Sequence, residues 1–185
     1  YRNKTNHYIS FPLKKKSGGD RLIKAPKKNL KILQRKLYTE LDKFQATKSS
    51  AHGFIKSRSI KTNATPHVQK RYVFNIDLKD FFNSIHFGRV RNLFMAEPIR
   101  APKNLATVLA QICCCEGRLP QGAPTSPLIA NMIMRKLDSQ LQALARENKC
   151  HYTRYADDLT FSFTCKKADL PTDLIDISES GTVQP

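Results

Sequence analysis

The sequence predicts an α+β fold in which an antiparallel sheet packs on helices. The clearest strand is residues 159–165, where apolar and polar side chains alternate as in a strand with one buried face. It is the second arm of a β-hairpin predicted over residues 152–165, and the apolar run 72–76 predicts a further, buried strand. Apolar side chains recur at helical spacing in three stretches, residues 27–44, 101–116 and 127–146.

Positive charge is concentrated in the first part of the chain. The 185 residues carry a net charge of +17. Residues 1–71 hold 19 Lys and Arg against three acidic residues, whereas residues 72–185 hold 13 against 12. This asymmetry predicts a polyanion-binding portion joined to an acid-containing portion that carries the chemistry. The alternative is a basic surface that serves only solubility.

The five cysteines indicate neither a zinc site nor a disulfide framework. None of them forms a C-x-x-C pair, although Cys113, Cys114 and Cys115 are consecutive, so we expect reduced, mostly buried thiols. The sequence has no apolar run of about 18 residues and no signal peptide, which favours a soluble cytoplasmic protein without membrane contact. It begins at Tyr1 without a methionine, so we expect a trimmed chain.

A basic hairpin is predicted near the N-terminus. Residues 8–11 and 22–26 form short strands, and the Ser-Gly-Gly-Asp sequence between them has turn-forming composition. Lys14, Lys15 and Arg21 fall at the tip, where the Arg fork and the Lys point charges suit phosphates. The alternative is a charged tip that is simply solvated.

The helix over residues 27–44 has a lysine-rich outer face. Its inner face consists of Leu30, Leu33, Leu37, Leu41 and Phe44. Residues 51–54 and the polar run 56–65 are expected to be loop. His67 is expected to be a structural histidine that holds this loop.

The second half of the chain continues with two helices. The core face of the helix over residues 101–116 consists of Leu105, Val108, Leu109, Ile112 and Cys113. Residues 119–127 form a rigid loop, after which Ser126 is expected to cap the next helix, with Pro127 in its first turn. That helix is apolar nearly all round in its first half and should be buried under a sheet. Its later part is amphipathic, through Leu137, Leu141 and Leu144.

Three carboxylates are candidates for a metal site. Asp157 and Asp158 are adjacent at the tip of the predicted hairpin, and two like charges this close are destabilising unless a cation lies beside them. Asp77 ends the strand 72–76, where a carboxylate among apolar neighbours is costly unless it is paired or metal-bound. The alternative is a solvated Asp-Asp turn.

Three motifs occur in order along the chain and together closely resemble those of reverse transcriptases. They are Asp77-x-x-Asp80-Phe81-Phe82, Leu119-Pro-Gln-Gly-Ala-Pro-Thr-Ser-Pro127 and Tyr155-Ala-Asp-Asp158. The lysine-rich hairpin and Ala51-His-Gly-Phe54 resemble finger motifs of the same family. Asn63-Ala-x-x-His67 is similar to a signature of bacterial retron reverse transcriptases. The resemblance covers roughly residues 8–165.

This resemblance implies the fingers and palm of a right-hand polymerase, with a palm sheet packed on helices. It implies two Mg²⁺ ions, with Asp77, Asp157 and Asp158 as catalytic and metal-binding residues. Asp77 and Asp157 are 80 residues apart, so only a sheet that pairs strand 73–77 with the hairpin can bring them together. Because adjacent side chains on a strand point to opposite faces, Asp158 is expected to be a peripheral ligand.

The resemblance also implies residues that bind the incoming nucleotide. Asp80 and Phe81 match the place where backbone amides meet the triphosphate. Phe82 matches the aromatic residue that lies under the sugar and excludes a 2′-hydroxyl, so dNTPs should be favoured over NTPs. For Phe81 and Phe82 the alternative is core packing.

Further residues match the remaining contacts of the family. Gln121 and Gly122 match the loop over the nascent base pair, although Gln121 could be a plain loop amide. Arg21, with either Lys14 or Lys15, matches the fingertip that closes on the phosphates. The side chains expected to contact RNA are Lys24, Lys27, Lys28, Lys56, Arg58, Asn63 and His67.

The chain is expected to divide into five segments. These are basic fingers (1–72), a palm strand with the first catalytic Asp (73–87), a helical insertion (88–120), the palm helix with the YADD hairpin (121–165) and an unassigned tail (166–185). No primer grip or helical thumb is recognisable after Cys165. We therefore expect the thumb to be absent from this chain, which alone should not be processive.

Together these features predict a retron-type RNA-directed DNA polymerase active in phage defence. Its partners would be a structured noncoding RNA that serves as template and primer, the RNA–DNA hybrid, dNTPs and a defence effector protein. One alternative is a catalytically idle, RNA-binding scaffold. Another is a reverse transcriptase of the group II intron, diversity-generating or abortive-infection type, including template-independent synthesis. The Asn63-Ala-x-x-His67 motif favours the retron type.

Overall fold

The computed structural model describes residues 7–14 and 18–165 and divides the chain into two compact units. Unit 1 comprises residues 1–46 and 80–134, and unit 2 comprises residues 47–79 and 135–185. In the described ranges, no helix has the length and apolar character that a bilayer crossing requires. The predicted tail, residues 166–185, lies outside the described residues.

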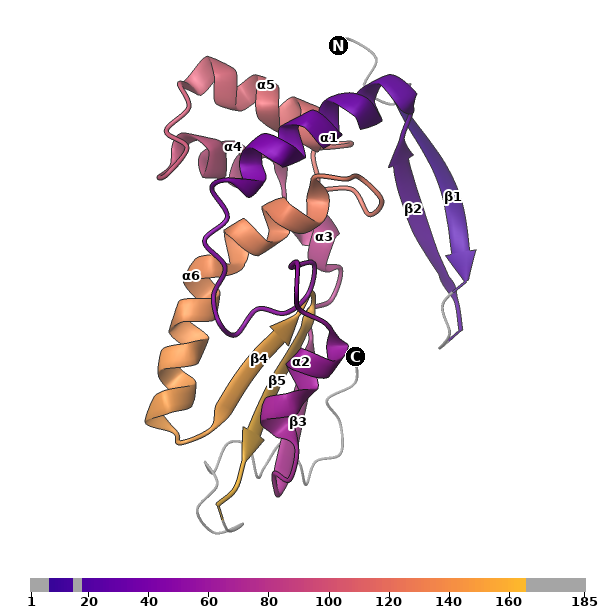
Figure 1. The fold of residues 1–185 in the computed structure, drawn as a ribbon. Helices are drawn as coiled ribbons and strands as arrows, with labels where there is room; N and C mark the ends of the chain where they lie inside the picture. Colours follow the sequence, from indigo (N-terminus) through magenta and orange to yellow (C-terminus); the bar gives the residue numbers. More distant parts are fainter. Residues whose placement is uncertain (1–6, 15–17, 166–185) are drawn as a thin grey trace. The chain divides into compact units, whose positions relative to one another are not determined.

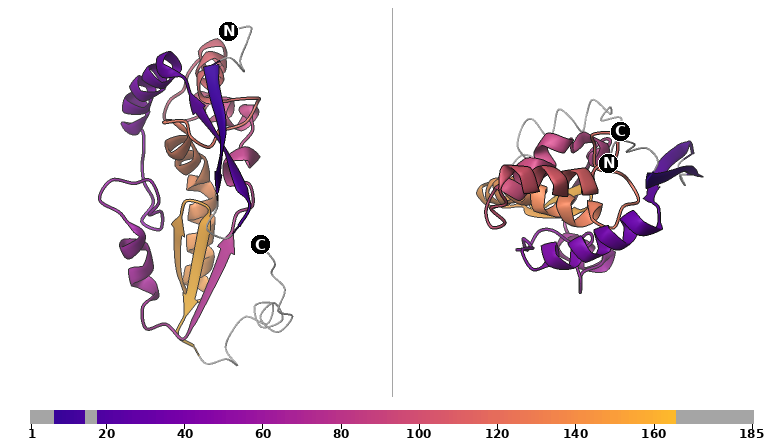
Figure 2. Two further views of the ribbon diagram at one scale, coloured as in Figure 1. Left: turned by 90° about the vertical axis from the view of Figure 1, so that its right-hand side faces the viewer. Right: turned by 90° about the horizontal axis from the view of Figure 1, so that it is seen from above.

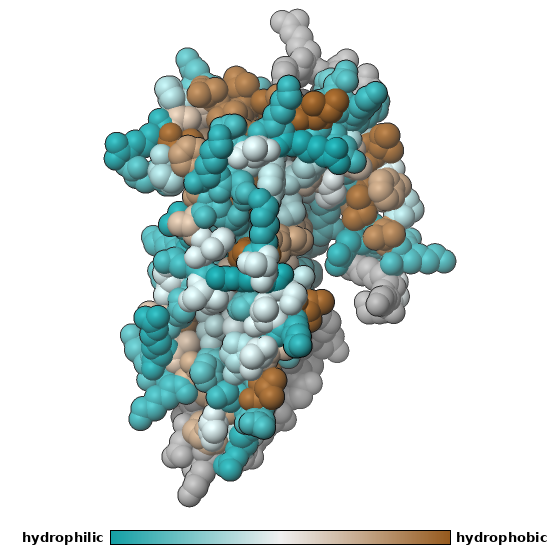
Figure 3. Space-filling view, in the orientation of Figure 1, coloured by the Kyte–Doolittle hydropathy of each residue, from teal (hydrophilic) through white to brown (hydrophobic). Residues whose placement is uncertain are grey.

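Unit 1 contains the predicted basic hairpin. Strands β1 (Tyr8–Lys14) and β2 (Asp20–Pro26) pair antiparallel, from Tyr8 opposite Pro26 to Lys14 opposite Asp20, and the twist of the pair is visible in Figure 2. The prediction of a hairpin here is confirmed. Ile9, Phe11 and Leu13 are exposed along one face of β1, and Figure 3 shows this apolar surface over the hairpin.

Helices make up the rest of unit 1. They are α1 (Lys28–Asp42), α3 (Phe81–Ser84), α4 (Phe87–Met95), α5 (Lys103–Cys113) and the first part of α6 (Ser126–Glu147). Helix α5 packs against α4 and α1. Helix α6 begins at Ser126 itself, whose buried hydroxyl has no hydrogen-bond partner among the described residues, so the predicted Ser126 cap is wrong.

The buried face of α5 differs from the predicted one. Ile112 and Cys113 of the predicted face are buried, but Leu105 and Val108 are 50% and 46% exposed, and Ala106 and Ala110 are buried in their place. The prediction weighted side chains by hydrophobicity, but the small side chains form the face on which a neighbouring helix can approach most closely. Cys113, Cys114 and Cys115 are buried free thiols, as predicted, and burial raises the pKa of Cys113 to about 12.

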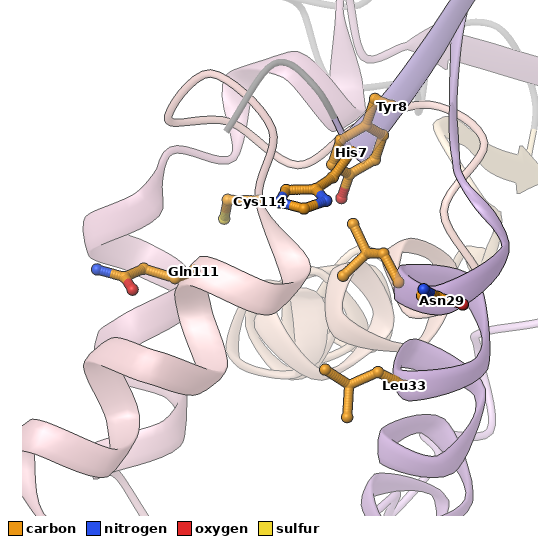
Figure 4. A pocket seen from close by; sticks show the side chains of 7 residues that line it. His7, Tyr8, Asn29, Leu33, Gln111 and Cys114 are labelled. Carbon is orange, nitrogen blue, oxygen red and sulfur yellow. The ribbon is translucent and has the colours of Figure 1, made fainter. Parts of the chain in front are cut away.

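A buried glutamine ties three elements of unit 1 together. The Gln34 side-chain nitrogen donates to the Tyr8 hydroxyl at 2.9 Å and to the Ile112 carbonyl at 2.8 Å. Gln34 thereby links α1 to β1 and α5. Beside this junction lies a cavity of about 290 Å³, and Figure 4 shows the side chains of Tyr8 and Leu33 at its wall.

Unit 2 is built on a three-stranded antiparallel sheet. Strands β3 (Tyr72–Asp77), β4 (His151–Tyr155) and β5 (Asp158–Phe163) are arranged in the order β3-β5-β4, with β5 in the middle (Figure 1). The predicted YADD hairpin is β4 and β5. Among the described residues, β3 is an edge strand with alternate residues exposed, so the prediction that it is buried is wrong.

Different elements cover the two faces of this sheet. Leu141 and Ala145, in the second part of α6, pack against Tyr152 and Leu159, and a cavity of about 410 Å³ lies between the helix and the sheet. On the other face, buried His67 contacts the strands. The prediction of one buried face on β5 is therefore too simple, because Ser162 and Phe163 are both buried.

The sequence predicts that the polar run 56–65 is a loop, but part of this run is helical. Residues Ile60–Ala64 form helix α2, followed by the 3-10 turn η2 (Thr65–His67). Ser59 and Thr62 bond reciprocally as a capping box, which satisfies two amide donors at the helix start. Thr62 takes the place where Glu or Gln is usual, so the start signal is weak in the sequence.

Replacing Gln34 tests how unit 1 is held together. We expect Gln34→Ala to lower the free energy of unfolding by about 2 kcal/mol, because the Tyr8 hydroxyl and the Ile112 carbonyl lose a buried partner. Urea unfolding measures the change. Lys36→Ala, at an exposed position of the same helix, is the control, and equal losses in the two variants would contradict the assigned role.

Candidate active site

The three candidate carboxylates lie at one end of the sheet in unit 2. Asp77 is the cross-strand partner of Asp158, at the last position of the β3–β5 ladder. The Leu78 amide then donates to the Asp157 carbonyl at 3.0 Å, so the chain after β3 is joined to the turn between β4 and β5. Paired residues of neighbouring strands present their side chains on the same face. Asp77 and Asp158 are therefore neighbours.

Asp157 belongs to the turn and not to the strand. Strand β5 begins at Asp158, so the alternation that was expected to set Asp158 apart from the other acids does not apply. Asp77 and Asp158 are exposed and Asp157 is half-buried. The expectation that Asp77 is buried among apolar residues is wrong, because it lies with Val73 and Asn75 on the exposed side of the edge strand.

The acids repel one another. Although the Asp158 side chain reaches solvent, desolvation by neighbouring groups raises its pKa, and the Asp157 and Asp77 carboxylates raise it further. The two neighbouring charges disfavour ionisation of Asp158, and a cation placed beside it would offset this cost. The charge pattern therefore favours a positively charged ligand at this end of the sheet.

The donor chemistry of this site fits Mg²⁺. Within residues 7–14 and 18–165, no group of three His, Cys, Asp or Glu side chains is placed so that it could hold a metal ion together. Mg²⁺ usually takes only one or two protein carboxylates and completes its shell with water and substrate phosphates. The carboxylates of Asp77 and Asp158, side by side at an open strand end, meet that requirement.

The turn that carries Asp157 is tightly packed. Ala156 has φ 58°, a left-handed conformation that is costly for a residue other than glycine. Gly53 lies directly against it, since a Cβ at Gly53 would be 2.4 Å from the Ala156 nitrogen. Backbone bonds at 2.7 and 2.8 Å join Arg154 to Ser50 and His52 on either side of Ala51. The Ala-His-Gly-Phe segment thus supports the turn.

A buried polar network lies next to the turn, and the sequence reasoning missed it. Arg154 donates from Nε and Nη2 to both carboxylate oxygens of Asp138, each at 2.8 Å. The Tyr152 hydroxyl donates to Asp138 as well, at 2.8 Å. Burial, followed by the Asp138 charge, raises the pKa of Tyr152. One sequence feature could have indicated this network: Asp138 lies on the same face of its helix as the apolar residues Leu141 and Ala145.

Comparison with known proteins identifies the family. Residues 13–182 match the reverse transcriptase (RNA-dependent DNA polymerase) family. The chain belongs to this family. It is 44% identical over 177 residues to the Retron Mx65 reverse transcriptase of Myxococcus xanthus, covering 87% of this chain and 42% of that protein. It is 42% identical over 158 residues to the Retron Ec86 reverse transcriptase of Escherichia coli, covering 84% and 48%.

A solved structure supports the fold. Telomerase from Candida albicans, in complex with a TWJ fragment of telomeric RNA, matches with a TM-score of 0.56 at 10% identity. The match covers 95% of this chain and 40% of that one. The predicted α+β fold of fingers and palm is confirmed. The chain spans less than half the length of the retron relatives named above.

The reverse transcriptase motifs of unit 1 take defined conformations. Asp80 adopts φ 51° and precedes α3, where Phe81 is buried and Phe82 is half-buried. The two rings meet edge to face, with centroids 5.2 Å apart. Core packing is therefore part of the role of Phe81, while Phe82 keeps an accessible surface.

The other predicted nucleotide-binding residues of unit 1 lie on the hairpin and beside it. Lys14 and Arg21 are exposed near the hairpin turn, and Lys15 lies outside the described residues. The Gln121 carbonyl accepts from the Lys24 amide at 2.8 Å. A Cβ at Gly122, which has φ 121°, would lie 3.0 Å from the Lys24 carbonyl oxygen, so glycine permits this close approach of loop and strand.

The residues expected to contact RNA fall into two groups. Lys27, Lys28 and Lys56 are exposed. Lys24 is paired with Glu116, and the Arg58 guanidinium donates to backbone carbonyls, among them that of Lys48 at 2.7 Å. The second group thus has a structural role within the protein.

The Asn63 to His67 motif has mainly internal partners. The Asn63 carbonyl accepts a long bond from the Thr153 hydroxyl at 3.4 Å. The two ring nitrogens of His67 lie 2.7 Å from the hydroxyls of Ser162 and Thr153. His67 is buried, so the prediction of a structural histidine is confirmed.

The stability of unit 2 should depend on pH through His67. Burial, and then the positive charges of His151, His52 and Lys70, lower the pKa of His67 below its usual 6.5. Below about pH 6.5 His67 binds a proton in the unfolded chain but not in the folded chain. The free energy of unfolding therefore falls as the pH falls. We expect the free energy of unfolding to decrease from pH 7.5 to 5.5, and to decrease less in His67→Gln. An equal decrease in variant and wild type would exclude this group as a cause.

Proposed function

We propose that the protein to which this chain belongs is an RNA-directed DNA polymerase of the retron type. One observation carries the proposal: the β3–β5 register pairs Asp77 with Asp158 and joins Asp157 to the same strand end, in a chain of the reverse transcriptase family. The 44% identity with the Retron Mx65 reverse transcriptase supports the type.

The reaction we propose is nucleotidyl transfer from a dNTP to a primer 3′-hydroxyl. Two Mg²⁺ ions held by Asp77 and Asp157, with Asp158 beside them, would activate the hydroxyl and neutralise charge on the triphosphate. The carboxylates of the protein hold negative charge at the strand end and fix where these cations bind. This role is supported by the Asp157 and Asp77 charges, which together with desolvation raise the pKa of Asp158.

The nucleotide would be bound by residues of unit 1. We propose that the backbone at Asp80 and Phe81 contacts the triphosphate and that the half-buried Phe82 ring lies against the sugar, which favours dNTPs. Arg21 and Lys14 are exposed, as a phosphate-binding role requires. Gln121 and Gly122 are proposed to lie over the nascent base pair.

The template we propose is a structured noncoding RNA. The first 71 residues contain 19 Lys and Arg, and Lys27, Lys28 and Lys56 are exposed on the surface. Retron relatives motivate the further proposal that the RNA also serves as primer and that the product acts in phage defence with an effector protein.

Removing one carboxylate tests the reaction. Residues 1–185 would be joined to the part of the Mx65 reverse transcriptase that follows the matched region, and primer extension measured on an RNA template with dNTPs. We expect Asp157→Asn to reduce incorporation at least about 100-fold, because a metal ligand loses its charge. Glu147→Gln, which changes an exposed acid at the end of α6, is the control.

The product distinguishes the proposed reaction from its rivals. Sequencing should show a DNA strand complementary to the RNA. A strand without complementarity would indicate template-independent synthesis. Retention of RNA without any incorporation would contradict the polymerase and leave an RNA-binding protein.

A further inference from the structure

Arg154 occupies an unusual place for an arginine. It lies in the middle of β4, one residue before Tyr155, and its side chain is fully buried. Its charge is matched by Asp138, which is 1% exposed, through the two bonds of 2.8 Å described above. A buried pair of this kind is weak evidence for stability, because desolvation offsets much of the attraction. A contribution to stability therefore does not by itself explain why an arginine occupies this position.

A third donor of Arg154, Nη1, contacts the turn between β4 and β5 that carries Asp157. Nη1 donates to the Ala156 carbonyl at 2.9 Å. This carbonyl belongs to the peptide unit whose nitrogen is that of Asp157, and a peptide unit is planar. The bond to this carbonyl therefore orients the peptide plane between Ala156 and Asp157, to which the Asp157 Cα is attached.

Asp138 keeps the guanidinium in the orientation that this bond needs. The planar fork has its Nε and Nη2 edge on the carboxylate, so Nη1 is left to point at the turn. The Tyr152 hydroxyl holds Asp138 Oδ1 in turn. The chain of contacts thus runs from α6 through Arg154 to the turn, while Gly53 packs on the Ala156 nitrogen.

We propose that Arg154 is a positioning residue for Asp157, with Asp138 as its anchor. The bond to Ala156 holds a left-handed residue in place and sets where the Asp157 carboxylate can meet a divalent cation. Because Asp138 neutralises the guanidinium, the effect on the metal site is geometric and not a matter of charge. The inference rests on the proposed polymerase function.

Arg154→Lys separates positioning from simple core stability. Lysine keeps a positive charge for Asp138 but cannot form the fork and the third bond together. We expect the Kd of Mn²⁺, followed by electron paramagnetic resonance, to rise about tenfold, as when a partner that orients a metal ligand is removed. We also expect the Mg²⁺ concentration for half-maximal incorporation to rise and the KM for dNTP to stay unchanged. Arg146→Lys, at an exposed position of α6, is the control.

The two measurements keep the inference distinct from the function on which it rests. If wild type incorporates no nucleotide, the polymerase proposal fails, and Mn²⁺ binding still tests Arg154. If Arg154→Lys lowers the unfolding temperature but leaves the Mn²⁺ Kd and the Mg²⁺ dependence at wild-type values, Arg154 is only structural and the proposal is overturned.

A milder variant decides the case in which Arg154→Lys does not fold. Tyr152→Phe keeps the ring that stacks on Phe161 at 4.9 Å and removes only the bond to Asp138. We expect a rise in the Mn²⁺ Kd of about threefold, smaller than for Arg154 because the change is one contact further from the turn. An unchanged Kd would overturn the proposal.

Discussion

The pairing of β3 with β5 is the constraint on which the site depends. Its register places Asp77 opposite Asp158, and the Leu78 amide continues the pairing to the Asp157 carbonyl. A shift by one residue would move the Asp77 side chain to the other face of the sheet, away from Asp158. Ile76 of β3 packs against the buried cluster of Ala145, Tyr152 and Leu159, and the same slip would turn Ile76 away from this cluster, which opposes the shift. Core packing and site geometry are thus set by one register.

Buried polar groups complement this register. His67 contacts the hydroxyls of Thr153 and Ser162 on one face of the sheet, and Arg154 with Asp138 lies on the face that packs against α6. Each group is satisfied only in one arrangement of the strands, so a wrong pairing would leave it buried without partners. His67 and Arg58, which are expected from the sequence to contact RNA, have hydrogen-bond partners within the scaffold.

The sequence predicted local structure well and tertiary detail less well. Period-2 alternation and turn composition gave both hairpins, and the spacing of leucines gave α1. The predicted buried face of α5 was wrong at Leu105 and Val108, because the alanines that replace them pack closely without standing out as hydrophobic. The position of Asp158 relative to Asp77 required the register between segments 80 residues apart, and Asp138 could not be matched to Arg154 without the helix lying on the sheet. Family motifs supplied the acids, and the structure supplied their arrangement.

The most direct test is to locate a divalent cation at the strand end. Crystals of the chain soaked in Mn²⁺ would be measured by anomalous diffraction. The account predicts a peak about 2.1 Å from carboxylate oxygens of both Asp77 and Asp157, with Asp158 adjacent. Carboxylates of Asp77 and Asp157 that face separate surfaces, with Mn²⁺ bound elsewhere, would contradict it.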